Sequence, residues 1–259
     1  MRGFDVIGNI AVINLPYSSR RQQQEARRLA KKLLKFKYIK TVAIKSGKFK
    51  GKLRKASYTI IAGLKSLETI HRENGCLIKL NIAETYFSPR LAADRLEIAK
   101  QVKQGEKVLV MFAGVLPYTL AIARNSKAKE IYAVEINRAA IKYAKENIKL
   151  NKVGSIRLIQ GDVKKIALQL RKKGLKFNRI VMPRPQLKET FLKEAFMLAA
   201  RGCIIHYHDF LREEEIAGIV ERIQQKAKNF NQRIKMLYLR KIGEIAPHKY
   251  RVRVDFKVL

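Results

Sequence analysis

The positions of hydrophobic residues divide the chain at about residue 80. Before that point, β-branched residues dominate residues 5–14, and Gly8-Asn9 interrupts them as a turn or a bulge. Two serines then precede residues 20–36, where apolar residues recur at helical spacing and the opposite face is almost entirely Lys, Arg and Gln. Two more apolar runs follow. This pattern predicts a small α+β domain over residues 1–80.

After that point, strand-like apolar runs alternate with helical segments. Five such runs lie at residues 106–114, 130–136, 155–162, 178–185 and 202–210. Helices are expected over Leu91–Val102 and over residues 137–153, the latter with Asn137 as its N-cap. Residues 235–259 have the pattern of an antiparallel hairpin. The alternation predicts a second domain, residues 81–259, with a doubly wound parallel α/β sheet covered by helices on both faces.

Charge is the first compositional feature that adds to this picture. The chain has 56 Lys and Arg against 21 Asp and Glu, a net charge of +35. A compact body this positive suits a polyanionic partner such as nucleic acid, although a general lysine bias is the alternative. Basic residues gather in Arg20–Lys37 and in Lys45–Lys55, a segment suited to a phosphate backbone. The candidate contacts in the second segment are Lys48, Lys50 and Lys52.

Composition also argues against several classes of protein. No apolar run reaches the roughly 18–20 residues that span a bilayer, and the N-terminus lacks the pattern of a signal peptide, so we expect a cytoplasmic protein. Cys76 and Cys203 lie far apart, and His206 and His208 have no apparent third ligand, so we expect no metal site. The oligomeric state is left open, with a monomer as the expectation.

Two acids and a glycine turn indicate a cofactor site at one edge of the predicted sheet. Gly114 follows the first strand and Glu135 ends the second about 20 residues later, the spacing at which an acid binds ribose hydroxyls. Asp162 ends the third strand, where it can accept from an adenine amino group. Each acid alone is more often a helix cap or a surface charge. Leu116 and Pro117 replace further glycines, which disfavours a nicotinamide dinucleotide and favours S-adenosylmethionine.

The fourth strand ends in Met182–Pro185. Pro183 and Pro185 flank Arg184, and two prolines cannot continue a central ladder, so the chain must leave the sheet there. A plain strand terminator is one explanation. Because the turn lies beside the expected methyl donor, we predict instead that it forms a wall for the substrate base.

Several segments together make the chain similar to one family. They are FDVIGNIAVI, ETIHRENG, YFSPRL, MFAGV, AVEIN, NIKLNKV and IIHYHDF. In these the chain resembles the archaeal tRNA position-37 methyltransferases, which make N1-methylguanosine or methylate wyosine precursors. The resemblance implies a class I S-adenosylmethionine-dependent methyltransferase fold and tRNA as the partner. No counterpart is found to the tRNA-elbow domain of many relatives, so we expect the basic surface to supply most of the tRNA affinity.

The resemblance also assigns roles to single residues. Arg54 matches an arginine that steadies the purine O6, and Asp94 stands where the family usually has a Glu as general base. Tyr86 and Pro89 fall near the methionine end of the cofactor, and Arg95 matches a cofactor-contacting arginine. The remaining cofactor positions are Phe112, Gly114, Glu135, Asp162 and Val163. The substrate-side positions are Arg54, Lys48, Lys50, Lys52, Pro183, Arg184 and Pro185.

The substrate implied is the anticodon loop of tRNA(Phe) at nucleotide 37. Pro183 occupies the position of an Asn that the N1-guanosine enzymes usually carry, which makes the chain more similar to the branch that methylates C7 of 4-demethylwyosine. Relatives that transfer an aminocarboxypropyl group usually lack the Arg of SPR, so Arg90 favours methyl transfer. N1-methylation of G37, a bifunctional enzyme and a non-catalytic tRNA-binding protein are the alternatives.

Overall fold

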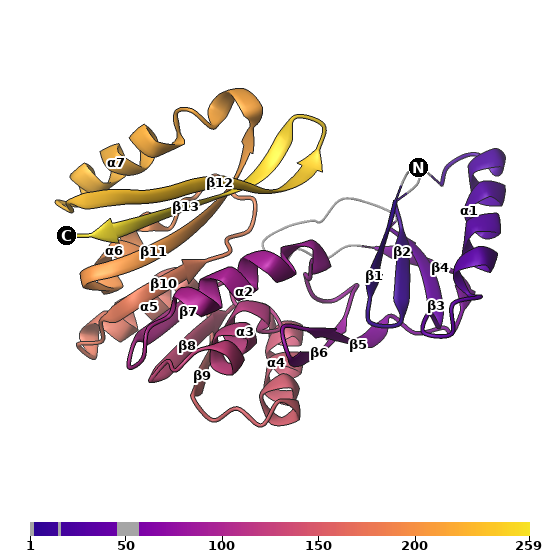
Figure 1. Ribbon diagram of the computed structural model, residues 1–259, viewed down its shortest axis with the longest axis horizontal. Coiled ribbons are helices and arrows are strands. Elements are labelled where there is room, and N and C mark those ends of the chain that lie inside the picture. The colour runs from indigo at the N-terminus through magenta and orange to yellow at the C-terminus, as the bar shows by residue number, and fades with distance from the viewer. Residues whose placement is uncertain (1–2, 15–16, 46–56) are drawn as a thin grey trace.

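The computed structural model describes residues 3–14, 17–45 and 57–259, which form a small sheet, a hairpin and a large sheet (Figure 1). The small sheet has the order β1-β2-β3-β4, and α1 packs on one face of it. Its elements are β1 (Phe4–Ile7), β2 (Ile10–Ile13), α1 (Arg20–Leu33), β3 (Thr41–Lys45) and β4 (Tyr58–Gly63). The interruption expected in residues 5–14 is a tight turn, so this stretch is a β-hairpin.

Helix α1 begins where two serines predicted it. Ser19 is the N-cap, accepting from the backbone N–H of Gln22, whose side chain bonds back in a capping box. Ala26, Ala30 and Leu33 are buried against the sheet. Because the apolar stripe is narrow and the other positions are mainly Lys, Arg and Gln, the rest of the helix presents a basic surface to solvent.

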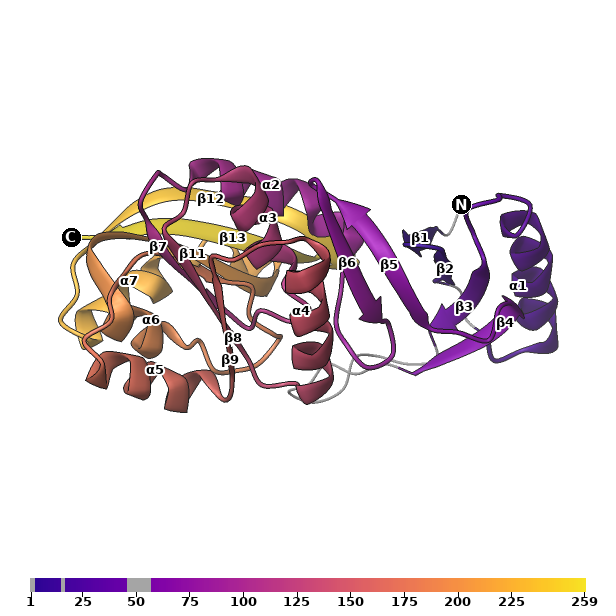
Figure 2. The ribbon, with the colours of Figure 1, turned by 90° about the horizontal axis from the view of Figure 1, so that it is seen from below.

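A hairpin, β5 (Glu68–Glu73) and β6 (Cys76–Asn81), connects the small sheet to the rest of the molecule (Figure 2). Asn147 and Asn151 each accept from and donate to the backbone of β6, at 2.7–3.0 Å, through Lys79 and Leu77. Asn147 belongs to α4 (Arg138–Leu150) and Asn151 is its C-cap. These side-chain amides satisfy backbone N–H and C=O groups of β6 that a neighbouring strand would otherwise pair with. The hairpin is thereby fixed on α4.

The large sheet has seven strands in the order β12-β13-β11-β10-β7-β8-β9. The strands are β7 (Lys107–Met111), β8 (Glu130–Glu135), β9 (Ile156–Gln160), β10 (Phe177–Met182), β11 (Ala199–Arg212), β12 (Ile234–Ala246) and β13 (Lys249–Val258). The first five are parallel, and the hairpin β12–β13 adds to β11 in the antiparallel sense. The doubly wound sheet with a C-terminal hairpin is therefore confirmed.

Helices cover both faces of this sheet, each over its own apolar core. One face carries α2 (Ala92–Gln101), α3 (Pro117–Asn125) and α4, and the other carries α5 (Val163–Lys172), α6 (Leu192–Leu198) and α7 (Ile219–Asn229). Within the described residues, no helix is long and apolar enough to cross a membrane.

Strand order determines where a ligand can enter. The chain starts the sheet in the middle at β7, continues outward to β8 and β9, and then returns to β10 on the other side of β7. The loops that follow β7 and β10 therefore diverge at the carboxyl ends of these two strands. Open α/β sheets bind ligands in the crevice at such a point.

Candidate active site

A hollow opens at the carboxyl ends of β7, β8 and β10. Its walls come from the segment before α2, the turn after β7, the start of α3, the end of β8, the turn after β10 and strand β13. A second hollow adjoins it and shares Phe112, Ile136 and Pro185 with the first. The site is thus a cleft divided into two adjoining hollows.

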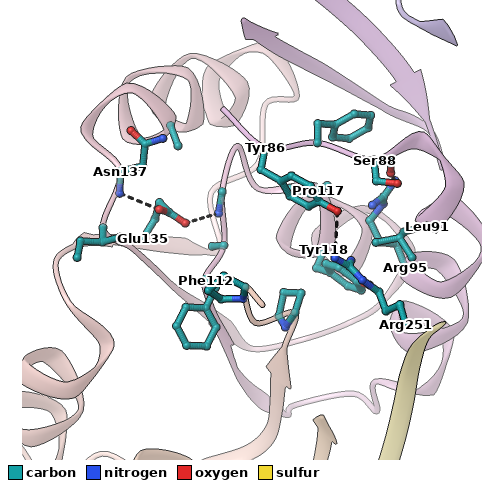
Figure 3. Close-up of a pocket in the computed structure, with 17 residues that line it drawn as sticks. Tyr86, Ser88, Leu91, Arg95, Phe112, Pro117, Tyr118, Glu135, Asn137 and Arg251 are labelled. Atoms are coloured by element: carbon teal, nitrogen blue, oxygen red, sulfur yellow. Dashed lines mark hydrogen bonds between the residues drawn. The ribbon is translucent and has the colours of Figure 1, made fainter. Parts of the chain in front are cut away.

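Glu135 joins the ends of β7 and β8 (Figure 3). Its Oε2 accepts from the backbone N–H of Gly114 and its Oε1 from that of Asn137, both at 2.7 Å. Burial raises the pKa of this carboxyl, although the two N–H groups favour the charged form. Each oxygen keeps a second lone pair, so the carboxylate can accept hydroxyl groups of a ligand in the hollow.

The turn after β7 has an uncommon backbone. Gly114 has φ +56° and Phe112, which is not a glycine, has φ +59°. The Phe112 ring packs edge-on against Phe191, with centroids 4.8 Å apart, and lines both hollows. Its unfavourable conformation therefore places an aromatic wall at the division of the cleft.

Asp162 and Val163 line the second hollow, as Glu135 lines the first. The Asp162 carboxylate also accepts from the backbone N–H of Lys164 at 2.8 Å and caps α5. Asp162 therefore has both roles considered from the sequence, since it caps a helix and lines a hollow.

The other end of the first hollow is aromatic and basic. Tyr86, Arg95, Tyr118 and Arg251 line it, and the Tyr86 hydroxyl accepts from Arg251 at 3.0 Å (Figure 3). Arg95 pairs with Glu73 at 2.5 Å and donates to the carbonyl of Ser88. Pro89 begins the short turn Pro89–Leu91, of which Leu91 is the residue lining this hollow.

Asp94 lies beneath this hollow and does not line it. Its carboxylate accepts from the Tyr118 hydroxyl at 2.6 Å, contacts His208 Nε2 at 3.0 Å and pairs with Arg253 at 2.6 Å. Burial alone would raise its pKa, but His208, Arg253 and Tyr118 together hold the pKa well below its ordinary value of 3.8. Asp94 is therefore ionised and separated from the hollow by Tyr118.

His206 and His208 lie two residues apart in β11, and both are engaged by protein groups. Arg179, which has only donors, contacts Nε2 of His206 at 2.8 Å, so the proton of this ring lies on Nδ1 and is donated to Asp255. Within the described part of the chain, no group of three His, Cys, Asp or Glu side chains is arranged to hold a metal ion.

The turn after β10 has two kinds of side chain. Pro183 and Pro185 line the first hollow, whereas Arg184 is buried, with 4% of its surface exposed. Its guanidinium pairs with Asp209 and donates to the carbonyls of Leu187 and Glu189. Arg184 thus holds the loop that carries the two prolines, and it does not line the hollow.

Four predicted contacts, Arg54, Lys48, Lys50 and Lys52, lie outside the described residues. Arg90, whose presence favoured methyl transfer in the sequence, forms a bidentate ion pair with Asp5 of β1, at 2.8 and 3.0 Å. Tyr118 and Arg251 were missed as pocket residues. The alternation of charged and apolar residues in β13 was the only pattern that marked Arg251, and such alternation usually indicates a solvent-exposed face.

Comparison with known proteins gives two family matches that meet near residue 67. The TRM5/TYW2 methyltransferase domain matches residues 69–236, and the TYW2 N-terminal domain matches residues 1–66.

Three relatives illustrate the range of named activities. The tRNA (guanine(37)-N(1))-methyltransferase Trm5b of Pyrococcus abyssi is 40% identical, covering 98% of this chain and 74% of its own length. The tRNA (guanine(37)-N(1))/4-demethylwyosine(37)-methyltransferase Taw22 of Nanoarchaeum equitans is 31% identical, covering 99% of both chains. The tRNA(Phe) (4-demethylwyosine(37)-C(7)) aminocarboxypropyltransferase of Methanocaldococcus jannaschii is 30% identical, covering 98% and 97%.

Solved structures agree with these matches. The complex of aTrm5 with tRNALeu superimposes with a TM-score of 0.87 at 31% identity, covering 99% of this chain and 72% of the other. TYW2 from M. jannaschii in complex with AdoMet gives a TM-score of 0.73 at 26% identity, covering 99% and 100%.

Proposed function

Because the chain belongs to the TRM5/TYW2 methyltransferase family, we propose a specific reaction for it: methylation of C7 of 4-demethylwyosine at position 37 of tRNA(Phe), giving isowyosine. At the level of the family, the protein is an S-adenosylmethionine-dependent methyltransferase that binds tRNA and modifies its nucleotide 37.

The divided cleft fits this cofactor. We assign the ribose to Glu135, whose oxygens keep free lone pairs, and the adenine to the second hollow beside Asp162, with Phe112 between the two. The methionine part then extends toward Tyr86 and Arg95. When bound, S-adenosylmethionine supplies an electrophilic methyl group. The role of these residues is to hold the donor in line with the base, which is the main source of rate in such a transfer.

The observation that carries the C7 assignment is the proline wall. Pro183 and Pro185 line the first hollow, and a proline side chain has no donor or acceptor for the edge of a guanine. A tricyclic, already cyclised base presents a larger apolar face, which packs well on such a surface. The buried ion pair between Arg184 and Asp209 holds the loop that carries these two prolines.

We propose that the departing proton passes through Tyr118 toward Asp94. Tyr118 lines the hollow, and its hydroxyl donates to the Asp94 carboxylate, so it can accept a proton from the substrate while passing its own to Asp94. Arg54 is proposed, from the resemblance alone, to polarise the base.

We also propose two domains, residues 1–80 for tRNA and residues 81–259 for catalysis. The hairpin β5–β6 connects them, because Thr69 and His71 accept from the backbone N–H groups of Asn9 and Gly8, while the Asn147 amide bonds to β6. A tRNA held by the small sheet would thereby be placed relative to the cleft.

N1-methylation of G37 is the second candidate, and the 40% identity to Trm5b of P. abyssi favours it. The experiment that decides uses two tRNA(Phe) substrates, one with G37 and one with 4-demethylwyosine, and S-adenosylmethionine labelled either in the methyl group or in the carboxyl carbon. Methyl label on the 4-demethylwyosine substrate alone supports C7 methylation.

Four other outcomes would contradict this assignment. Methyl label on the G37 substrate alone would establish the N1 reaction, and label on both substrates would establish a bifunctional enzyme. Transfer of carboxyl label would establish aminocarboxypropyl transfer, the activity named for the M. jannaschii relative. No transfer despite tRNA binding would leave a non-catalytic tRNA-binding protein.

A further inference from the structure

Arg251 is a buried cation that forms no ion pair with a carboxylate among the residues that the structure describes. Five arginines are buried in the described part of the chain, and four pair with an acid: Arg95 with Glu73, Arg179 with Glu106, Arg184 with Asp209, and Arg253 with Asp94. Arg251 is 3% exposed, and no Asp or Glu of residues 3–14, 17–45 or 57–259 forms an ion pair with it. The remaining residues, 1–2, 15–16 and 46–56, include no Asp or Glu in their sequence.

The contacts of Arg251 orient its guanidinium without neutralising it. One nitrogen donates to the Tyr86 hydroxyl at 3.0 Å, and the group lies over the Phe210 ring at 4.5 Å and the Tyr86 ring at 5.7 Å. An arginine has five N–H donors in a planar fork, so donors remain for a further partner. A buried charge without a counter-charge is unfavourable, and an anionic ligand removes this penalty.

The position of Arg251 indicates which ligand supplies that anion. Arg251 lines the first hollow on the side opposite Glu135 (Figure 3). Arg95, the other arginine in this wall, is already paired with Glu73. If the ribose lies at Glu135, the far end of the hollow receives the methionine part of the cofactor, which ends in a carboxylate.

We propose that Arg251 binds the α-carboxylate of S-adenosylmethionine and so positions the methyl donor. This inference rests on the proposed function, since it takes the hollow to be the cofactor site. A phosphate of the tRNA has the same oxyanion chemistry and is the other source that the test must separate.

The test compares S-adenosylmethionine with its decarboxylated form, which keeps the adenosine, sulfonium and amine, by calorimetry on the full chain. We expect wild type to bind the decarboxylated form about tenfold or more weakly, the effect of losing a charge-assisted contact. Arg251→Met should lose this preference and bind both forms alike, whereas Arg251→Lys should keep part of it. Lys257→Met, an exposed lysine near the other end of the same strand, is the matched control and should behave as wild type.

Unchanged affinity of Arg251→Met for the decarboxylated form shows that the variant is folded. If this variant still prefers S-adenosylmethionine by the wild-type factor, the proposal is overturned. A loss of affinity for a tRNA(Phe) transcript, with cofactor binding unchanged, would also overturn it and assign Arg251 to an RNA phosphate. Wild type that binds neither cofactor form would refute the proposed function itself. Wild type that binds both forms equally would overturn only the assignment of Arg251.

Discussion

The Tyr118 hydroxyl donates to the Asp94 carboxylate across 2.6 Å, and this contact separates the expected base from the cleft. Asp94 belongs to α2, yet its other partners, His208 and Arg253, come from β11 and β13, more than 100 residues later in the chain. The acid is therefore part of a buried ionic cluster, and Tyr118 is the member of that cluster that lines the first hollow.

Replacing Tyr118 by Phe should lower kcat by about 10²-fold, because it removes the hydroxyl that joins the cleft to Asp94 but keeps the ring. Cofactor affinity should change little. Single-turnover methyl transfer and calorimetry measure the two effects. Tyr143→Phe, which loses a hydroxyl bonded to Glu68 away from the cleft, is the control. An unchanged kcat in Tyr118→Phe would exclude the relay.

Replacing Asp94 by Asn should destabilise the fold by about 3–5 kcal/mol, because Arg253 and His208 lose a buried counter-charge. Urea unfolding at pH 7 measures this loss. A change below 1 kcal/mol would show that the cluster contributes little to stability.

The same carboxyl should make stability depend on pH. Its pKa in the folded protein is lowered, so its contribution is present above its ordinary value of 3.8 and is lost as pH falls from there toward the folded value. Wild type should therefore lose stability below about pH 4 more steeply than Asp94→Asn does. Parallel urea titrations between pH 3 and 7 test this, and equal slopes for the two proteins would contradict it.

Replacing Glu135 by Gln should weaken S-adenosylmethionine binding about 10- to 100-fold. Both carboxylate oxygens accept backbone N–H groups, and an amide would direct its own donors at one of them. Calorimetry measures the affinity. Glu130→Gln, at the opposite end of the same strand, is the matched control. Equal affinity in Glu135→Gln and wild type would remove Glu135 from the cofactor site.

The ion pair between Asp5 and Arg90 should help to place tRNA and contribute little to stability. It joins β1 to the turn before α2, and the Arg90 side chain is 57% exposed, so its loss should cost less than about 1 kcal/mol. Arg90→Asp should raise the KM for tRNA while cofactor affinity is unchanged. The double variant Asp5→Arg/Arg90→Asp should recover part of the KM. A change of product from methyl to aminocarboxypropyl transfer would instead support a direct role of Arg90 in donor choice.

Affinity for tRNA should fall steeply with added salt. A net charge of +35, with an exposed basic face on α1, favours binding through phosphates, and each neutralised phosphate releases counterions. Filter binding between 50 and 200 mM salt should show losses of about 10³-fold if some six phosphates are contacted. A flat profile would make the charge a compositional bias without a role in binding.

The sequence by itself determined the principal helices and strands, and it predicted the sheet edge that is proposed as the cofactor site. Hydrophobic periodicity located the helices and strands, because each must bury one face. The spacing of Gly114, Glu135 and Asp162 predicted a common site, because the carboxyl ends of consecutive parallel strands meet at one edge of a sheet. The structure brings these three residues to two adjoining hollows, because the inference depends on local pattern and on a topology that few alternatives share.

Only the tertiary structure decided how the charges are partnered. Asp94, Arg184 and Arg253 each have partners distant in sequence, and Arg251 has no acid at all among the described residues. No local pattern encodes these pairings, because a buried charge is stabilised by whichever element packs against it. The electrostatic role of a side chain is therefore set by the packing of the whole sheet and its helices.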